Sequence, residues 1–248
     1  MPSPWAGFEE DLARRRDAGR PALFWWRDDD AAGPTPEISR LLELSRSAEV
    51  PLALAVVPQA AQSALFRLLH ARVAVLQHGG DHHNRAGPGE KKTEFPAAER
   101  EEEALARIAA GRERLESLAG TWLMPVFAPP WNRLRGALAA RLPQLGLRGL
   151  STFGPRPPQP PAPALVQVNT HVDIVAWHAG RGFIGEEQAL AIARRQLDAL
   201  SGEPTGWLTH HAVHDAACWA FLERLFEVTR RAGGSWAHPQ SVFVPAAG

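Results

Sequence analysis

Short apolar runs alternate with helix-like segments along nearly the whole chain, and this alternation constrains the fold more than any other feature. Four of the strand-like runs are PALFWW, PLALAVV, VAVLQH and GWLTHH, at residues 21–26, 51–57, 73–78 and 206–211. Strands that alternate with helices pair in parallel. About seven such repeats within 248 residues are too many for two domains, so we expect one irregular, closed or nearly closed (β/α)7 barrel of the TIM-barrel-like α/β class.

The other elements are expected from the same patterns. Further strand ends are predicted in MPVFAPPW, LRGLSTF and VQVNTHVDIVAW. Helices are predicted at residues 1–20, 36–47, 62–70, 97–118, 186–200 and 215–231. The proline-rich stretch 154–163 is too short for a linker and is predicted to be a stiff surface loop within a single catalytic domain, residues 1–248.

Composition excludes several classes of partner. The formal net charge is zero, which argues against nucleic acid or an anionic membrane as the partner. Cys218 is the only cysteine, so no internal disulfide is possible, and we expect it to be buried and inert. The first residues lack the apolar centre of a signal peptide, and no stretch is long enough to span a bilayer, so we expect a soluble cytoplasmic protein.

Acidic and histidine residues cluster where the strand-like runs end. Asp28, Asp29 and Asp30 close one run, His78 and His82 follow another, and His210-His211 ends a third. Strand ends in α/β enzymes converge on a common site, and two histidines with one carboxylate form the ligand set of many hydrolytic metal centres. A helical turn over the histidines at i and i+4 would place both imidazoles beside one metal ion.

Three adjacent carboxylates repel one another unless a cation lies nearby. Helix capping could account for one of them, because Asp30 precedes a predicted helix. A divalent metal that binds one carboxylate, while a neighbouring carboxylate acts on the bound water, accounts for more. Arg27 directly precedes the triplet and could hold one carboxylate ionised.

Five short motifs occur in an order that resembles the polysaccharide deacetylase family of carbohydrate esterases. They are RDDDAAGP, HGGDH, FAPPWN, HVDIVAW and WLTH, and together they span residues 27–210. The resemblance implies an irregular (β/α)7 barrel and hydrolysis of an acetamide by metal-activated water. The ordered set is far more specific than any single motif.

The resemblance also implies a role for each matching residue. Asp30, His78 and His82 are expected to bind the metal, Asp29 to act as general base, and His210 to act as general acid with support from Asp173. The backbone of Trp131 and the side chain of Trp177 are expected to contact the oxyanion and the substrate. Residues that could support these groups are Arg27, Asp28, His83, Arg133, His211, His214 and Asp215.

Two positions depart from the family pattern. Ala128 stands where an arginine usually braces the catalytic aspartate, so Arg27 or Arg133 would have to replace that arginine. Ala176 stands where an aspartate usually supports the catalytic histidine, so Asp173 or Asp215 would have to replace that carboxylate.

The leading hypothesis is a deacetylase that acts on an N-acetylated sugar or glycan and needs one divalent metal. Zinc suits a ligand set of two histidines and one aspartate, although cobalt, nickel or iron would also fit. Two alternatives stay open: an amidohydrolase for a small non-sugar amide, and a degenerate carbohydrate-binding pseudoenzyme. The expected partner is a small molecule or an oligosaccharide, and the sequence gives no oligomeric state.

Overall fold

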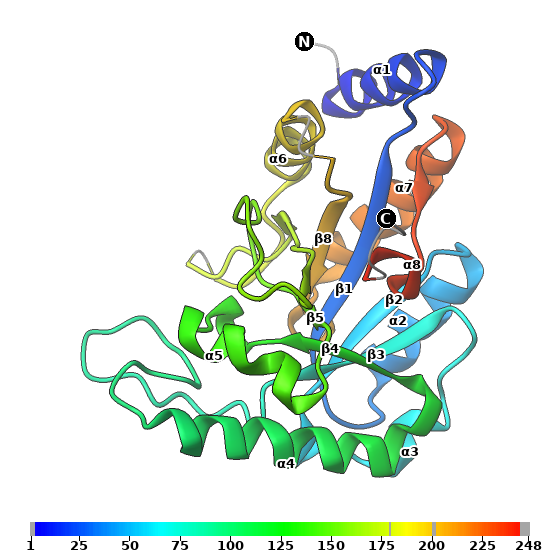
Figure 1. Ribbon diagram of the computed structural model, residues 1–248. Helices are drawn as coiled ribbons and strands as arrows, with labels where there is room; N and C mark the ends of the chain where they lie inside the picture. Colours follow the sequence, from blue (N-terminus) through cyan, green and yellow to red (C-terminus); the bar gives the residue numbers. More distant parts are fainter. Residues whose placement is uncertain (1–2, 179, 200–201, 244–248) are drawn as a thin grey trace.

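The computed structural model describes residues 3–178, 180–199 and 202–243, which are organised around one parallel sheet (Figure 1). The strand order is β6-β5-β4-β3-β2-β1-β8-β7, and β9 pairs with β1. The sheet curls into a half-barrel that stays open, within the described residues, because its end strands β6 and β7 do not pair. The predicted α/β barrel class is confirmed. The strands are β1 (Leu23–Ala31), β2 (Leu52–Val56), β3 (Val73–His78), β4 (Leu123–Ala128), β5 (Gly149–Leu150), β6 (Val166–Gln167), β7 (Val172–Asp173), β8 (Thr205–Thr209) and β9 (Ser235–Trp236).

Helices follow most of the strands and cover the outside of the sheet (Figure 1). The α-helices are α1 (Pro4–Asp17), α2 (Pro36–Ser47), α3 (Ser63–Phe66), α4 (Glu101–Ala119), α5 (Gly136–Arg141), α6 (Glu186–Asp198), α7 (Ala216–Arg231) and α8 (Pro239–Val242). Short 3₁₀ turns are η1 (Pro58–Ala60), η2 (Gly120–Trp122), η3 (Pro130–Asn132), η4 (Leu142–Leu145) and η5 (His211–Val213). No helix in the described ranges has the length and apolar character needed to cross a membrane.

Side chains of the strands alternate between the two faces of the sheet, as a period of two requires. Phe24 and Trp26 pack in the large cluster beneath the helices, whereas Trp25 packs with Ala53 and Ala55 in a second cluster on the other face. Small residues on this second face leave room for the sheet to curl. Both faces of the sheet are therefore apolar, the outer face beneath the helices and the inner face within the half-barrel, as expected for a parallel sheet.

Several predicted boundaries were wrong. The helix predicted at residues 62–70 is confined to α3, because the chain has only a few residues in which to turn back before β3 begins at Val73. The helix predicted from residue 97 begins at Glu101, because the carbonyls of Ala97 and Glu99 accept hydrogen bonds from Arg135 instead of helical amides. Residues 1–2 of the first predicted helix and residue 200 of the fifth lie outside the described residues. Residues 154–163 form no helix or strand, as predicted.

Candidate metal centre

The acidic triplet lies at the end of β1, where a bulge sends the three carboxylates in different directions. Between Asp28 and Ala31 the register against β2 advances by three residues on β1 but only two on β2. The extra residue on β1 is accommodated at Asp30, which has a φ of 71°. Aspartate tolerates this left-handed conformation better than most residues. Each of the three aspartates therefore has its own partner: His211 for Asp28, Arg27 for Asp29 and His78 for Asp30. These partners offset the repulsion among adjacent carboxylates that the sequence predicts.

Asp29 is buried against Arg27, the residue two positions before it on the same face of β1. The guanidinium donates two hydrogen bonds to the carboxylate, from Nε to Oδ1 at 2.8 Å and from Nη2 to Oδ2 at 2.9 Å. Arg27 also donates to Ser151 Oγ at 2.6 Å and to Asn132 Oδ1 at 2.5 Å. Its side chain is completely buried, so this ion pair is shielded from solvent.

Arg27 therefore contacts Asp29 in the way expected of the arginine that Ala128 replaces. Arg133, the other candidate, is exposed, and its guanidinium donates to the carbonyl of Lys92. The expectation for Arg133 was wrong because the turn η3 directs its side chain away from Asp29.

The side chains of Asp30, His78 and His82 converge beside this pair. Asp30 Oδ1 lies 3.1 Å from Nε2 of His78 and 3.1 Å from Nε2 of His82, and one ligand atom from each residue lies within 4.8 Å of the others. Nδ1 of His78 lies 3.0 Å from the carbonyl oxygen of Ala128, to which it can donate. In a neutral His78 this bond would direct the Nε2 lone pair at a carboxylate oxygen, an arrangement that calls for a cation between them.

Without an ion, the pKa shifts favour an ionised Asp30 beside a protonated His78, whose proton a metal ion would displace on binding. Burial opposes ionisation of Asp30, but hydrogen bonds from His78 and His82 outweigh it and hold the pKa of Asp30 far below its ordinary value. Burial alone would lower the pKa of His78, but the carboxylates of Asp29 and Asp30 outweigh burial and raise it. The donor set and its charge therefore fit a divalent metal ion such as zinc.

The turn after β3 brings His82 back toward His78 without forming a helix, so the expected helical turn was wrong. Gly79 has a φ of 66°, and a Cβ there would overlap Pro130 and the carboxylate of Glu94. His82 itself is left-handed, with a φ of 58°, and its ring packs on that of Trp131 at 4.5 Å between centroids. Glycine is needed because the chain passes so close to Glu94.

Glu94 holds this turn in place, and no motif in the sequence indicated it. Its fully buried carboxylate accepts hydrogen bonds from the backbone N–H groups of Gly80 at 2.9 Å, Asp81 at 3.2 Å and His82 at 3.2 Å. Arg107 on α4 donates to the same carboxylate from Nε at 3.1 Å. Glu94 thus fixes the backbone that carries one of the three candidate ligands.

Replacing Glu94 with glutamine is expected to weaken zinc binding by about 10- to 100-fold, the usual effect of losing a group that supports a ligand. The amide would place a donor opposite at least one backbone N–H that now has an acceptor. Zinc titration of the metal-free protein measures the effect. Glu99→Gln is the matched control, because Glu99 also pairs with Arg107 but makes no hydrogen bond to the turn. Equal dissociation constants for the two variants would contradict this role.

His210, the expected general acid, lies at the end of β8 beside Asp173. Its Nδ1 is buried without a hydrogen-bond partner in the described part of the chain, 3.9 Å from Asp173 Oδ1. Trp177 Nε1 donates to Asp173 Oδ2 at 2.7 Å, and the indole packs edge-on against His210 at 4.6 Å between centroids. Burial raises the pKa of Asp173, although His210 and Trp177 oppose that shift. Of the two carboxylates expected to support His210, Asp173 is the one that lies beside its ring.

Asp28 lies on the opposite face of β1 from Asp29 and holds the segment that carries His210. Its Oδ2 accepts from Thr209 Oγ1 at 2.6 Å and from the backbone N–H of His211 at 3.0 Å. Its Oδ1 lies 2.5 Å from Nδ1 of His211. Burial raises the pKa of Asp28, but the His211 imidazole outweighs it and lowers that pKa, as expected for a buried ion pair.

The remaining candidates are Asp215, His214 and His83, which are not among the three candidate metal ligands. Asp215 caps α7 by accepting from Cys218 N and also accepts from Phe183 N, so it does not replace the missing aspartate beside His210. His214 accepts a hydrogen bond from the backbone N–H of His210, and burial lowers the pKa of His214 to about 4. His83 is exposed, and no contact of its side chain is recorded in the described ranges.

Solved structures share this fold, whereas no protein-family model and no curated protein matches the sequence. A peptidoglycan N-acetylglucosamine deacetylase in complex with a substituted N-oxidanyl-benzamide is 14% identical over 98% of this chain and 97% of that chain, with a TM-score of 0.60. A family 4 carbohydrate esterase from Streptomyces lividans in complex with acetate is 16% identical over 92% and 97%, with a TM-score of 0.56. A family 4 pseudoenzyme from Bacillus anthracis is 12% identical over 90% and 65%, with a TM-score of 0.59.

The TM-scores show a common fold, and at these low identities they show the fold alone. The chain has the fold of the polysaccharide deacetylases, in agreement with the order of its motifs. One of the neighbours is a pseudoenzyme, so the shared fold does not by itself indicate activity.

Proposed function

We propose that this protein is a metal-dependent amide hydrolase that removes acetyl groups from an N-acetylated sugar or glycan. The observation that carries the proposal is the buried Asp29–Arg27 ion pair next to the converging ligand atoms of Asp30, His78 and His82. A carboxylate held ready beside a cation site is what activation of water requires, whereas carbohydrate binding alone requires neither group. We take residues 1–248 as one catalytic unit.

A divalent cation held by Asp30, His78 and His82 would polarise the amide carbonyl and lower the pKa of a water molecule. Two imidazoles and one carboxylate make zinc the first choice, and cobalt, nickel or iron are the alternatives.

The chain supplies the proton transfers. Asp29 accepts a proton from the attacking water, and Arg27 keeps its carboxylate in one orientation. His210 donates a proton to the departing amine, with Asp173 beside its ring. The backbone N–H of Trp131 stabilises the oxyanion, and Trp177, whose side chain is partly exposed, offers its ring to a sugar face.

Two other functions use the same residues differently. A small non-sugar amide would need the same acid, base and metal, so only the substrate would change. A pseudoenzyme would keep the fold without the chemistry, but this chain retains both candidate proton-transfer groups and all three candidate ligands. Hydrolysis is therefore favoured over binding alone.

A substrate screen tests the activity. Metal-free protein would be reloaded separately with zinc, cobalt, nickel or iron and incubated with N-acetylated sugars, sugar nucleotides, oligosaccharides and small amides. Release of acetate with a free amine from the sugars supports the proposal. Release only from non-sugar amides would move the assignment to the second function, and no release from any compound with any metal would support the pseudoenzyme.

His78→Ala is expected to weaken metal binding by more than about 100-fold, beyond the effect of losing a supporting group, and to abolish turnover. His83→Ala is the matched control, because this neighbouring histidine is exposed on the same loop. Metal analysis after gel filtration measures the retained ion. Equal metal content in the two variants would remove the candidate centre from consideration.

A further inference from the structure

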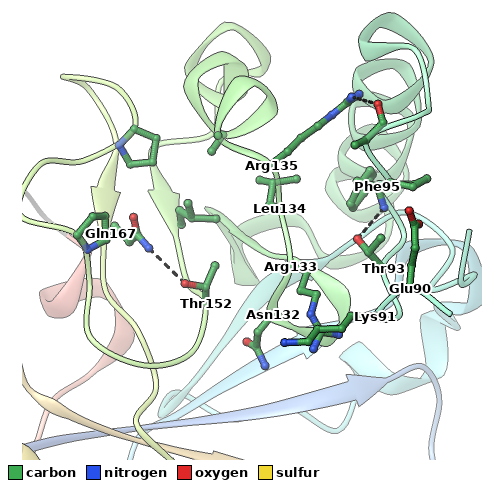
Figure 2. Close-up of a pocket in the computed structure, with 17 residues that line it drawn as sticks. Glu90, Lys91, Thr93, Phe95, Asn132, Arg133, Leu134, Arg135, Thr152 and Gln167 are labelled. Atoms are coloured by element: carbon green, nitrogen blue, oxygen red, sulfur yellow. Dashed lines mark hydrogen bonds between the residues drawn. The ribbon is translucent and has the colours of Figure 1, made fainter. Parts of the chain in front are cut away.

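A cavity of about 620 Å³ is lined by residues that contact Arg27, the partner of Asp29 (Figure 2). Two of its lining residues, Asn132 and Thr152, also contact Arg27: Asn132 Oδ1 accepts from Nη2, and the carbonyl of Thr152 lies 3.5 Å from Nη1. The proline-rich loop contributes Pro157 and Pro161 to its wall. The cavity has the size of a small-molecule site and lies next to the residues proposed to carry out hydrolysis.

Part of the cavity wall is apolar and firmly packed. Phe95, Ala139 and Leu150 line it and are almost completely buried in one hydrophobic cluster, and Leu134 packs against that cluster. Figure 2 shows Phe95 and Leu134 on the side of the cavity formed by the loop before α4 and the segment before α5. Leu134, which is only partly buried, is therefore the apolar side chain available to the face of a sugar ring or to an aglycone, and the buried cluster holds it in place.

The cavity also carries uncompensated positive charge. Lys91, Arg133 and Arg135 line it together with one carboxylate, Glu90. Figure 2 shows the charged ends of Lys91 and Arg133 close together, whereas the guanidinium of Arg135 is turned toward the segment before α4. Among the described residues no carboxylate lies within 4.0 Å of the charged nitrogens of these three side chains. Instead, Arg133 and Arg135 donate to backbone carbonyls.

Arginines elsewhere near the site do have carboxylate partners. Arg85 pairs with Asp81 at 2.6 Å, and Arg107 pairs with Glu94 at 3.1 Å. The cavity thus differs from its surroundings, in a chain whose formal net charge is zero. Guanidinium and ammonium groups without a carboxylate partner are suited to bind phosphate or carboxylate groups of a ligand.

Gln167 adds a hydrogen-bond acceptor to the cavity wall. The residue is only 8% exposed, and its Nε2 donates to Thr152 Oγ1 and Asn169 Oδ1, each at 3.2 Å. Its Oε1 is buried and has no partner within the described residues. Turning the amide over would place two acceptors together at Asn169, because Asn169 Oδ1 already accepts hydrogen bonds from Thr152 N and Oγ1. A hydroxyl donor on a ligand would satisfy Oε1.

We propose that this cavity binds a negatively charged substituent, a phosphate or a carboxylate, on the acylated sugar that the protein hydrolyses. This inference rests on the proposed function, because it assigns a substrate class to the same site. Lys91 and Arg133 bind the anion, Leu134 contacts the ring, and Gln167 accepts a hydrogen bond from a hydroxyl group.

The test compares three substrates of the zinc-loaded protein: an N-acetylated hexosamine, its phosphate monoester and its uronic-acid counterpart. We expect kcat/KM to be at least about tenfold higher for one of the charged substrates, the effect of one charge-assisted hydrogen bond. The substrate that is preferred identifies the anion. In a Lys91→Gln/Arg133→Gln variant the preference should fall toward unity, and in wild type it should weaken in high salt. Arg67→Gln is the control, because Arg67 is exposed and does not line the cavity.

A binding measurement separates this inference from the proposed function. Calorimetry with the deacetylated amino sugar and its charged counterparts requires no turnover. Anion-dependent binding that is lost in the double variant supports the cavity assignment even if no substrate is hydrolysed, in which case only the proposed function fails. Hydrolysis without any preference for a charged substrate overturns the cavity assignment and leaves the proposed function standing. Binding that the double variant leaves unchanged also overturns the cavity assignment, whether or not any substrate is hydrolysed. Neither binding nor turnover would overturn both.

Discussion

Arg27→Met is expected to lower the free energy of unfolding by roughly 3–5 kcal/mol, the usual cost of leaving one member of a buried ion pair without its partner. The completely buried guanidinium neutralises Asp29 and also donates to Ser151 and Asn132. Denaturant titration of the metal-free protein measures the change. The experiment is done without metal so that changes in metal binding do not contribute.

Two further variants sharpen this prediction. Arg46→Met removes an exposed arginine that pairs with Glu43, and we expect little change, because exposed pairs contribute little. Arg27→Met/Asp29→Leu removes both buried charges and should recover a large part of the lost stability. If Arg27→Met were no more destabilising than Arg46→Met, the buried ion pair would not have the role assigned to it.

Asp29→Asn and His210→Ala are each expected to lower kcat by roughly a hundredfold or more, the usual contribution of a positioned base or acid. Neither residue is among the three candidate ligands, so metal affinity should change little. Steady-state kinetics on the best substrate of the screen, together with metal analysis of each variant, would measure both quantities. Full turnover by His210→Ala would show that another group protonates the amine, even with the metal centre correctly assigned.

The sequence predicted the fold class well because the dominant signal was local. Each apolar run is long enough to specify a buried strand, and parallel strands place their carboxyl ends on one edge of the sheet. Asp30, His78 and His82 therefore come together as expected, although they lie on two strand ends separated by β2. Their catalytic and ligand roles stay predictions.

Other parts of the site depend on geometry that a sequence pattern does not encode. The bulge in β1, which gives Asp30 partners different from those of Asp28, is a register shift against β2. Glu94 lies in an irregular loop without periodicity, so its contact with the turn after β3 arises only from the tertiary fold. From the sequence, either Arg27 or Arg133 could form the ion pair with Asp29. Only the alternation of side chains along β1, which places Arg27 and Asp29 on one face, distinguishes the two arginines.

The position of Arg27 on the same strand as Asp29 has a consequence for the geometry of the ion pair during thermal motion. Arg27 and Asp29 lie two residues apart on one strand, and β1 is flanked by β2 and β8. The covalent backbone fixes the spacing of two residues on one strand, whereas the spacing of residues on different strands depends on how those strands pair. The candidate base and its counter-charge therefore keep their separation when neighbouring strands shift, so the ion pair does not depend on the exact curvature of the sheet.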